Sequence, residues 1–188
     1  MNRHALVMDS DFAVVLAHRP NPVSMGNLAR YTPGVSQIDP TFSITGRVGG
    51  PTDGLEIRVE LDQDALKGRV GGIFGKDLNL SITETGVHGQ VGGSKGFLVS
   101  LELRGGELSG TLGNESLVVR GVDQVTGRLG DTIGGLEISA HQRGSKLSGR
   151  LGGLTGKMID LELGAAPGWI GVLTAVVALY ALERHSVR

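Results

Sequence analysis

The stretch Gly168–Leu182, GWIGVLTAVVALYAL, decides how the rest of the chain is interpreted. It contains no charged residue, and its length lies between the about 10–14 residues typical of a buried helix and the about 20 of a membrane span. As a helix it would be about 22 Å long, which matches a strand of about six or seven residues. We therefore expect either a core helix enclosed by the rest of the chain or a tail anchor over 165–183.

The composition favours a single domain with an aliphatic core. The chain has 188 residues, of which 39% are hydrophobic but only 4% aromatic. Its 32 glycines are far above the usual share of about 7%. A net charge of −1 gives no general attraction to nucleic acid, so we expect no nucleic-acid partner. Without cysteine the chain can form neither disulfides nor cysteine-based zinc sites.

The first forty residues differ in pattern from the rest. The short apolar runs His4–Met8 and Phe12–His18 suggest a small hairpin, and prolines break the chain after it. We expect 1–40 to be an N-terminal extension of a main domain over 41–188. Aspartates interrupt the apolar residues near the start, so we expect no signal peptide and a cytoplasmic location.

A glycine-rich motif recurs from residue 41 onward. Its copies are Gly46–Gly50, Gly68–Gly72, Gly89–Gly93, Gly110–Asn114, Gly127–Asp131 and Gly149–Gly153. Such regular self-similarity indicates one supersecondary unit used repeatedly. After each copy comes a strand that alternates apolar and polar residues. We predict these strands at Leu55–Leu61, Asp77–Thr83, Phe97–Leu103, Ser116–Arg120, Gly135–Ala140 and Met158–Leu163. The connecting turns are short enough to permit only antiparallel neighbours, which gives twelve strands running up and down.

The first glycine of each motif lies on the apolar face of its strand, as Gly68 does between Leu66 and Val70. A glycine there weakens a strand unless something approaches its backbone closely. A barrel of twelve strands is also too wide to be filled by its own side chains. We therefore predict an all-β fold with one helix, a closed antiparallel barrel around a buried helix at 168–183. Outward charges disfavour a transmembrane β-barrel, and hairpin-like turns disfavour a parallel β-solenoid.

A twelve-stranded antiparallel barrel that encloses the C-terminal apolar helix Gly168–Glu183 resembles the tubby-like superfamily. That group includes the tubby C-terminal domain, the phospholipid scramblases and the LURP-one-related proteins. The resemblance is architectural and covers roughly 41–183. It implies a non-enzymatic binding or scaffolding protein that contacts anionic lipid headgroups or a protein partner, with any membrane association peripheral. A head domain tail-anchored to a membrane by 165–183 is the alternative.

The candidate site residues are four arginines that each follow an inward glycine, namely Arg47, Arg69, Arg128 and Arg150. They share one level of the outer wall. The tubby-like resemblance implies that they contact anionic headgroups or phosphates. Cross-strand pairing with glutamates, worth about 0.2–1 kcal/mol per pair, is the other interpretation, and the near-zero net charge favours it.

Two turns, Gly71–Lys76 and Gly152–Lys157, look like half of a phosphate-binding loop. Asp77 and Met158 follow them, however, where that motif needs Ser or Thr and then a helix, so we interpret both as tight turns. The five histidines lack metal-ligand spacing, and no serine, histidine and acid constellation stands out. We expect no cofactor, no metal and no catalytic residue. An enzyme with a site formed by loops at one barrel end is the second alternative.

Overall fold

The computed structural model describes residues 41–50 and 52–184. The predicted extension over 1–40 lies outside the described residues. The strands are β1 (Thr41–Val48), β2 (Leu55–Asp62), β3 (Ala65–Val70), β4 (Lys76–Thr83), β5 (Gly86–Val91), β6 (Phe97–Arg104), β7 (Glu107–Leu112), β8 (Glu115–Arg120), β9 (Gln124–Leu129), β10 (Leu136–Arg143), β11 (Lys146–Leu151) and β12 (Lys157–Glu162). Three of the turns contain short 3-10 helices, η1 (Gly72–Phe74), η2 (Gly93–Lys95) and η3 (Gly153–Thr155).

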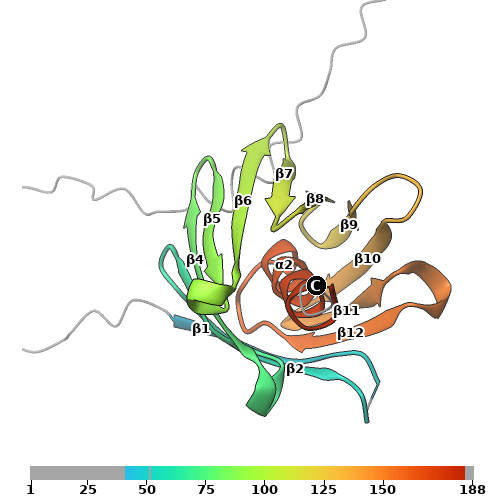
Figure 1. Ribbon diagram of the computed structural model, residues 1–188, viewed down its shortest axis with the longest axis horizontal. Helices are drawn as coiled ribbons and strands as arrows, with labels where there is room; N and C mark the ends of the chain where they lie inside the picture. The colour runs from blue at the N-terminus through green and yellow to red at the C-terminus, as the bar shows by residue number, and fades with distance from the viewer. Residues whose placement is uncertain (1–40, 51, 185–188) are drawn as a thin grey trace, which may run out of the picture.

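The strands form a closed antiparallel barrel (Figure 1). Each strand pairs with its neighbours in the chain, and β1 closes the barrel by pairing with β12, with Thr45 opposite Glu162 and Val48 opposite Ile159. The alternation in sequence becomes alternation in burial, since β2 buries Ile57, Val59 and Leu61 but exposes the residues between them. The predicted closed barrel of twelve strands is therefore confirmed.

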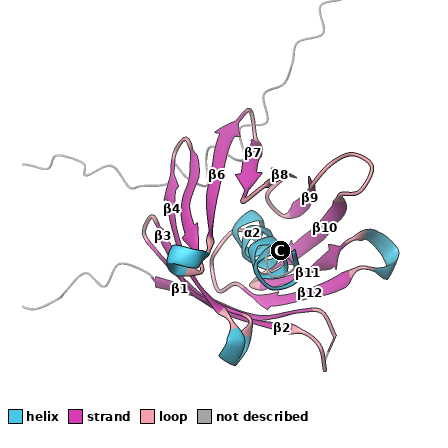
Figure 2. Cartoon of the chain, viewed as in Figure 1, coloured by secondary structure: helices cyan, strands magenta, loops and turns pink. Residues whose placement is uncertain are grey.

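Helix α2 (Gly168–Leu179) lies inside this barrel and is seen nearly end-on (Figures 1 and 2). All of its residues are buried, and it continues as a π-helical turn, η4 (Tyr180–Arg184). The buried hydroxyl of Thr174 donates a hydrogen bond from Oγ1 to the Ile170 carbonyl at 2.8 Å, which offsets the cost of burying it. The predicted core helix is confirmed. No helix among the described residues is long and apolar enough to cross a bilayer.

The helix packs closely on one part of the wall, against β1, β2 and β8 to β11. A Cβ atom on Gly171 would lie 2.6 Å from the Leu163 side chain and 2.8 Å from that of Leu147, so this glycine keeps the helix slim where the wall is nearest. Towards β6, a larger side chain fills the space. Tyr180 meets Phe97 edge to face with ring centroids 4.7 Å apart.

The strand glycines have a different cause from the one expected, because the neighbouring strand rather than the helix approaches them. At Gly68, φ is +154°, a value that side chains rarely adopt. A Cβ atom built there would contact the Arg58 carbonyl oxygen and lie 2.6 Å from the Val59 Cα atom, both on β2. The glycine therefore lets the backbone of β3 lie closer to that of β2 than a side chain would allow.

The barrel has two different ends. At the wide-turn end, each odd-numbered strand connects to the next strand. We define this end by the turn residues 49–50 with 52–54, and by the turns 71–75, 92–96, 113–114, 130–135 and 152–156. At the hairpin end, each even-numbered strand from β2 to β10 connects to the next strand. We define this end by the turns 63–64, 84–85, 105–106, 121–123 and 144–145. The chain enters α2 from the hairpin end. Its last turn reaches the wide-turn end, where Tyr180 Oη accepts a hydrogen bond from the Asn114 amide at 3.1 Å.

Candidate binding surface at the wide-turn end

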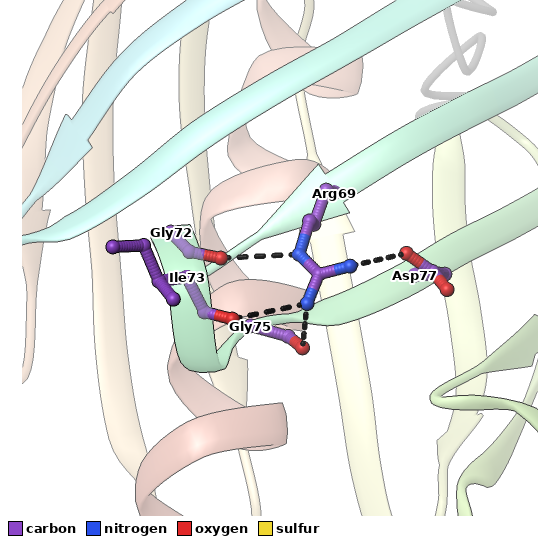
Figure 3. Close-up of polar contacts among 5 residues, drawn as sticks. All are labelled: Arg69, Gly72, Ile73, Gly75 and Asp77. Carbon is purple, nitrogen blue, oxygen red and sulfur yellow. Dashed lines mark hydrogen bonds and ion pairs between the residues drawn. The ribbon is translucent and has the colours of Figure 1, made fainter.

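Arg69 binds the carbonyl groups of the turn that follows its own strand (Figure 3). Its Nε donates to Gly72 O at 3.1 Å, and its Nη2 donates to Ile73 O at 3.2 Å and Gly75 O at 3.1 Å. Its Nη1 lies 3.2 Å from Asp77 Oδ1 on β4. The guanidinium thus donates hydrogen bonds to turn carbonyls that accept none from the strand ladder. These bonds hold η1 in place.

Three other repeats use a side chain at the same position in the same way. Arg128 donates to the Thr132 carbonyl at 2.9 Å, and Arg150 donates to the Leu154 carbonyl at 2.7 Å. Gln90 stands at the equivalent position on β5 and donates to the Gly93 carbonyl at 2.5 Å. Arg47 lies at the matching position on β1, with its Nε next to Gly54. Four of the side chains at this level therefore hold turns, which differs from the cross-strand pairing with glutamates that the sequence suggested.

Replacing Arg69 by alanine is expected to lower the free energy of unfolding by about 1 kcal/mol. Its hydrogen bonds are numerous, but the side chain is 49% exposed, and water replaces part of what is lost. Urea unfolding of Arg69→Ala would measure the change. Arg58→Ala is the control, because its exposed pair with Glu56 contributes little. Equal effects of the two substitutions would contradict the role given to Arg69.

The tips of the wide turns carry the most exposed apolar side chains among the described residues. Ile73 and Phe74 on η1 are 89% and 92% exposed, Ile133 in the β9–β10 turn is 101% exposed and Leu154 on η3 is 92% exposed. Leu98 and Met158, the remaining exposed large hydrophobic residues of the described chain, each stand one residue inside a strand that begins at this end. All six therefore belong to one end of the barrel.

The hairpin end has the opposite character. Its turns and the adjoining strand ends present charged and polar residues, among them the exposed side chains of Asp62, Asp64, Glu84 and Asp123. The fold itself does not require apolar tips on the wide turns, since the turns at 92–96 and 113–114 present Ser94, Lys95 and Asn114 there. The segregation of exposed apolar residues therefore points to a contact made by the wide-turn end.

The helix terminus is tied to this end by an ion pair. Lys157 Nζ lies 2.8 Å from Glu183 Oε1 and 3.9 Å from Asp53 Oδ2. The hydrogen bond to the Glu183 carboxylate raises the pKa of Lys157 above its ordinary value, partial burial acts in the opposite direction, and the negative charges of Glu183 and Asp53 add to the rise. Lys157 on β12 thus links η4, through Glu183, to the β1–β2 turn, through Asp53.

Lys157→Met is expected to lower the free energy of unfolding by about 0.5 kcal/mol at neutral pH, since the pair is partly solvated. A raised pKa in the folded state means that this contribution is present below the ordinary lysine pKa and disappears as the pH rises through the folded value. The difference from the unchanged protein should therefore vanish at strongly alkaline pH. Urea unfolding across the alkaline range would measure it, and a constant difference would contradict the ion-pair explanation.

A groove of about 950 Å³ runs along the outer wall over β9 to β11. Its lining includes the polar side chains of Glu137, Ser139, His141 and Arg150, and Leu154 stands at its wide-turn end. The lining holds acids and bases together, without an arrangement that indicates a nucleophile activated by a base. No group of three or more acidic or histidine residues within 41–50 and 52–184 could hold a metal ion.

Sequence reasoning placed the four arginines at one level but missed the exposed apolar tips. Ile73 and Phe74 lie in Gly71–Lys76 and Leu154 lies in Gly152–Lys157, the two stretches that look like half of a phosphate-binding loop. Both stretches form tight turns, as predicted. The missed signal is an apolar residue between turn glycines, where no strand face can bury it. Comparing Gly71–Lys76 with Gly92–Gly96, which carries Ser94 and Lys95 instead, would have revealed it.

The fold and this surface define a closed twelve-stranded antiparallel barrel with a buried C-terminal helix and one apolar end. Searches with this chain against protein-family models, curated proteins and solved structures find no match. Functional inference therefore rests on the geometry and chemistry of the described residues.

Proposed function

We propose that this protein is a non-enzymatic binding or scaffolding protein of the tubby-like type, with the wide-turn end as its binding face. The observation that carries the proposal is the gathering of the large exposed apolar side chains at that end. Burial of such side chains against a partner is favourable by about 25 cal/mol per Å² of apolar surface. The tubby-like assignment is supported by the number of strands, their closure and the enclosed terminal helix.

The turns that carry these side chains suit a binding role because they are held in place before contact. Glycines and the guanidinium groups of Arg69 and Arg150 hold η1 and η3. A surface that is already ordered loses less conformational entropy on binding. The interior of the barrel is filled by α2, so the proposal places binding on the outside. The cytoplasmic location expected from the sequence is part of the same proposal.

Photo-crosslinking at single positions in living cells of the native host tests this function. Benzoylphenylalanine replaces Phe74 at the wide-turn end or, as the matched control, Glu84 at the hairpin end, and both positions are exposed. We expect light-dependent adducts from position 74 well in excess of those from position 84. Equal adduct yields from the two positions would contradict a binding face at the wide-turn end.

A further inference from the structure

We infer that the partner of the wide-turn end is the interfacial region of a lipid bilayer, into which Ile73, Phe74, Ile133 and Leu154 insert. This inference rests on the proposed function of that end and names its partner. It also moves the membrane contact from the arginines to apolar turn tips, so that insertion rather than headgroup charge drives binding.

The spacing of the tips favours a fluid partner. They stand on three separate turns, between β3 and β4, between β9 and β10, and between β11 and β12, and the polar turn between β1 and β2 lies in the gap between two of them. The turns surround the end of α2 when the barrel is viewed along the helix (Figures 1 and 2). A protein partner would need a separate preformed pocket for each tip. The acyl–headgroup boundary of a bilayer accepts separate apolar side chains wherever they fall.

The distribution of charge agrees with this orientation. Lys76 and Lys157 directly follow the apolar turns, where a lysine can keep its ammonium group among headgroups while its stem lies along apolar surface. Acidic residues balance them, because Asp77 pairs with Arg69 and Glu183 pairs with Lys157. The wide-turn end therefore has no large surplus of positive charge, and binding should not require anionic lipid.

The apolar tips occupy only part of the rim of the wide-turn end, so the barrel should lie tilted against the membrane. The two neighbouring turns at 92–96 and 113–114 present Ser94, Lys95 and Asn114 in place of apolar side chains. The side of the barrel formed by β9 to β12 and β1 to β4 should therefore lie closest to the membrane. The β5 to β8 side stays nearer to water, and the charged hairpin end points away from the bilayer.

Vesicle flotation of the full chain tests the inference. The vesicles are pure phosphatidylcholine or phosphatidylcholine mixed with phosphatidylserine, and the variants are Phe74→Ser, Leu154→Ser and their combination. We expect flotation with both vesicle types, about tenfold weaker binding for each single variant and a larger loss for the double variant. Glu84→Ser at the hairpin end is the control and should bind as the unchanged protein does.

Because the substituted side chains are exposed, all variants should keep the thermal unfolding midpoint of the unchanged protein. Absence of flotation by the unchanged protein, or equal flotation of Phe74→Ser/Leu154→Ser, would overturn the inference. Binding to the anionic vesicles alone would overturn it in favour of headgroup capture by the arginines. Position-74 crosslinks to proteins alone would also overturn it while leaving the proposed function standing, whereas equal crosslinking at 74 and 84 would remove both.

Discussion

Deletion of residues 165–188 is expected to abolish the cooperative unfolding transition of the barrel. This deletion removes α2, whose side chains fill the space that the strands enclose. Each fully buried aliphatic side chain contributes about 1.5–3 kcal/mol, whereas a domain has a net stability of only about 5–15 kcal/mol. The aliphatic residues of α2 therefore contribute as much as the whole margin. Without them, the inward Leu, Ile and Val of the strands would line an open lumen.

Circular dichroism and calorimetry would measure this effect on the truncated protein. We expect a broad, non-cooperative loss of signal and binding of a hydrophobic dye to the exposed strand faces. Deletion of 185–188 alone is the control, since it leaves α2 and η4 in the chain. Leu173→Ala gives a graded version of the test, with an expected cost of about 2–5 kcal/mol for the cavity it creates. A truncated protein that unfolds sharply at the temperature of the full chain would show that the barrel stands without its helix.

Gly68→Ala is expected to lower the free energy of unfolding by about 3 kcal/mol or more. The new methyl group would meet the backbone of β2 at Arg58 and Val59, which cannot move without disturbing the ladder. The φ of +154° adds the cost of a conformation that alanine rarely adopts. Both penalties act on one strand of a closed ring, where a shift cannot be absorbed at a free edge.

Gly134→Ala is the matched control for this substitution. Gly134 lies in the β9–β10 turn, and a Cβ atom there would have no neighbour within 4 Å. We expect a change of at most about 0.5 kcal/mol for this variant. Urea unfolding of the two proteins should separate them clearly. Similar midpoints would mean that β3 can move away from β2 at little cost, and that close backbone approach is not the reason for the strand glycines.

The architecture was predictable because its signals are local and repeated. Alternation in segments such as Leu55–Leu61 sets the buried face of each strand, and the short turns set the antiparallel order. Closure followed from an apolar stretch, Gly168–Leu182, that needed an enclosure of matching height. The predicted strand boundaries differ from the observed ones by a few residues at most, as in β10, which runs to Arg143.

The surface was less predictable because it depends on where backbone groups lie. The bonds from Arg69 to three turn carbonyls require the geometry of η1, which glycines at positive φ create. The residues involved are three to six positions apart, and spacing alone does not distinguish them from a row of free guanidinium groups. The exposure of Phe74 is similarly a property of the turn, since the same residue on a strand would be assigned to the core.

Each wide turn has two roles, fixing its own backbone and presenting a side chain to a partner, and the repeat assigns them to different residues. Residues at its base, such as Arg150 and its flanking glycines, fix the backbone and recur in several copies. Residues at its tip differ between copies, with Leu154 on η3 but Ser94 on η2. The fold therefore constrains the base and leaves the tip free to carry binding specificity.

Contact between the wide-turn end and a membrane is tested most directly by a fluorescent reporter at each end. The chain has no cysteine, so Phe74→Cys and Glu84→Cys can each carry a single environment-sensitive label. The vesicles are added in at least about tenfold excess over the flotation assay, which offsets the weaker binding expected when Phe74 is replaced. On addition of phosphatidylcholine vesicles, the label at position 74 should brighten, shift to the blue and become quenched by brominated acyl chains, while the label at 84 stays unchanged. Identical, water-like spectra at both positions in the presence of vesicles would contradict insertion of the wide-turn end.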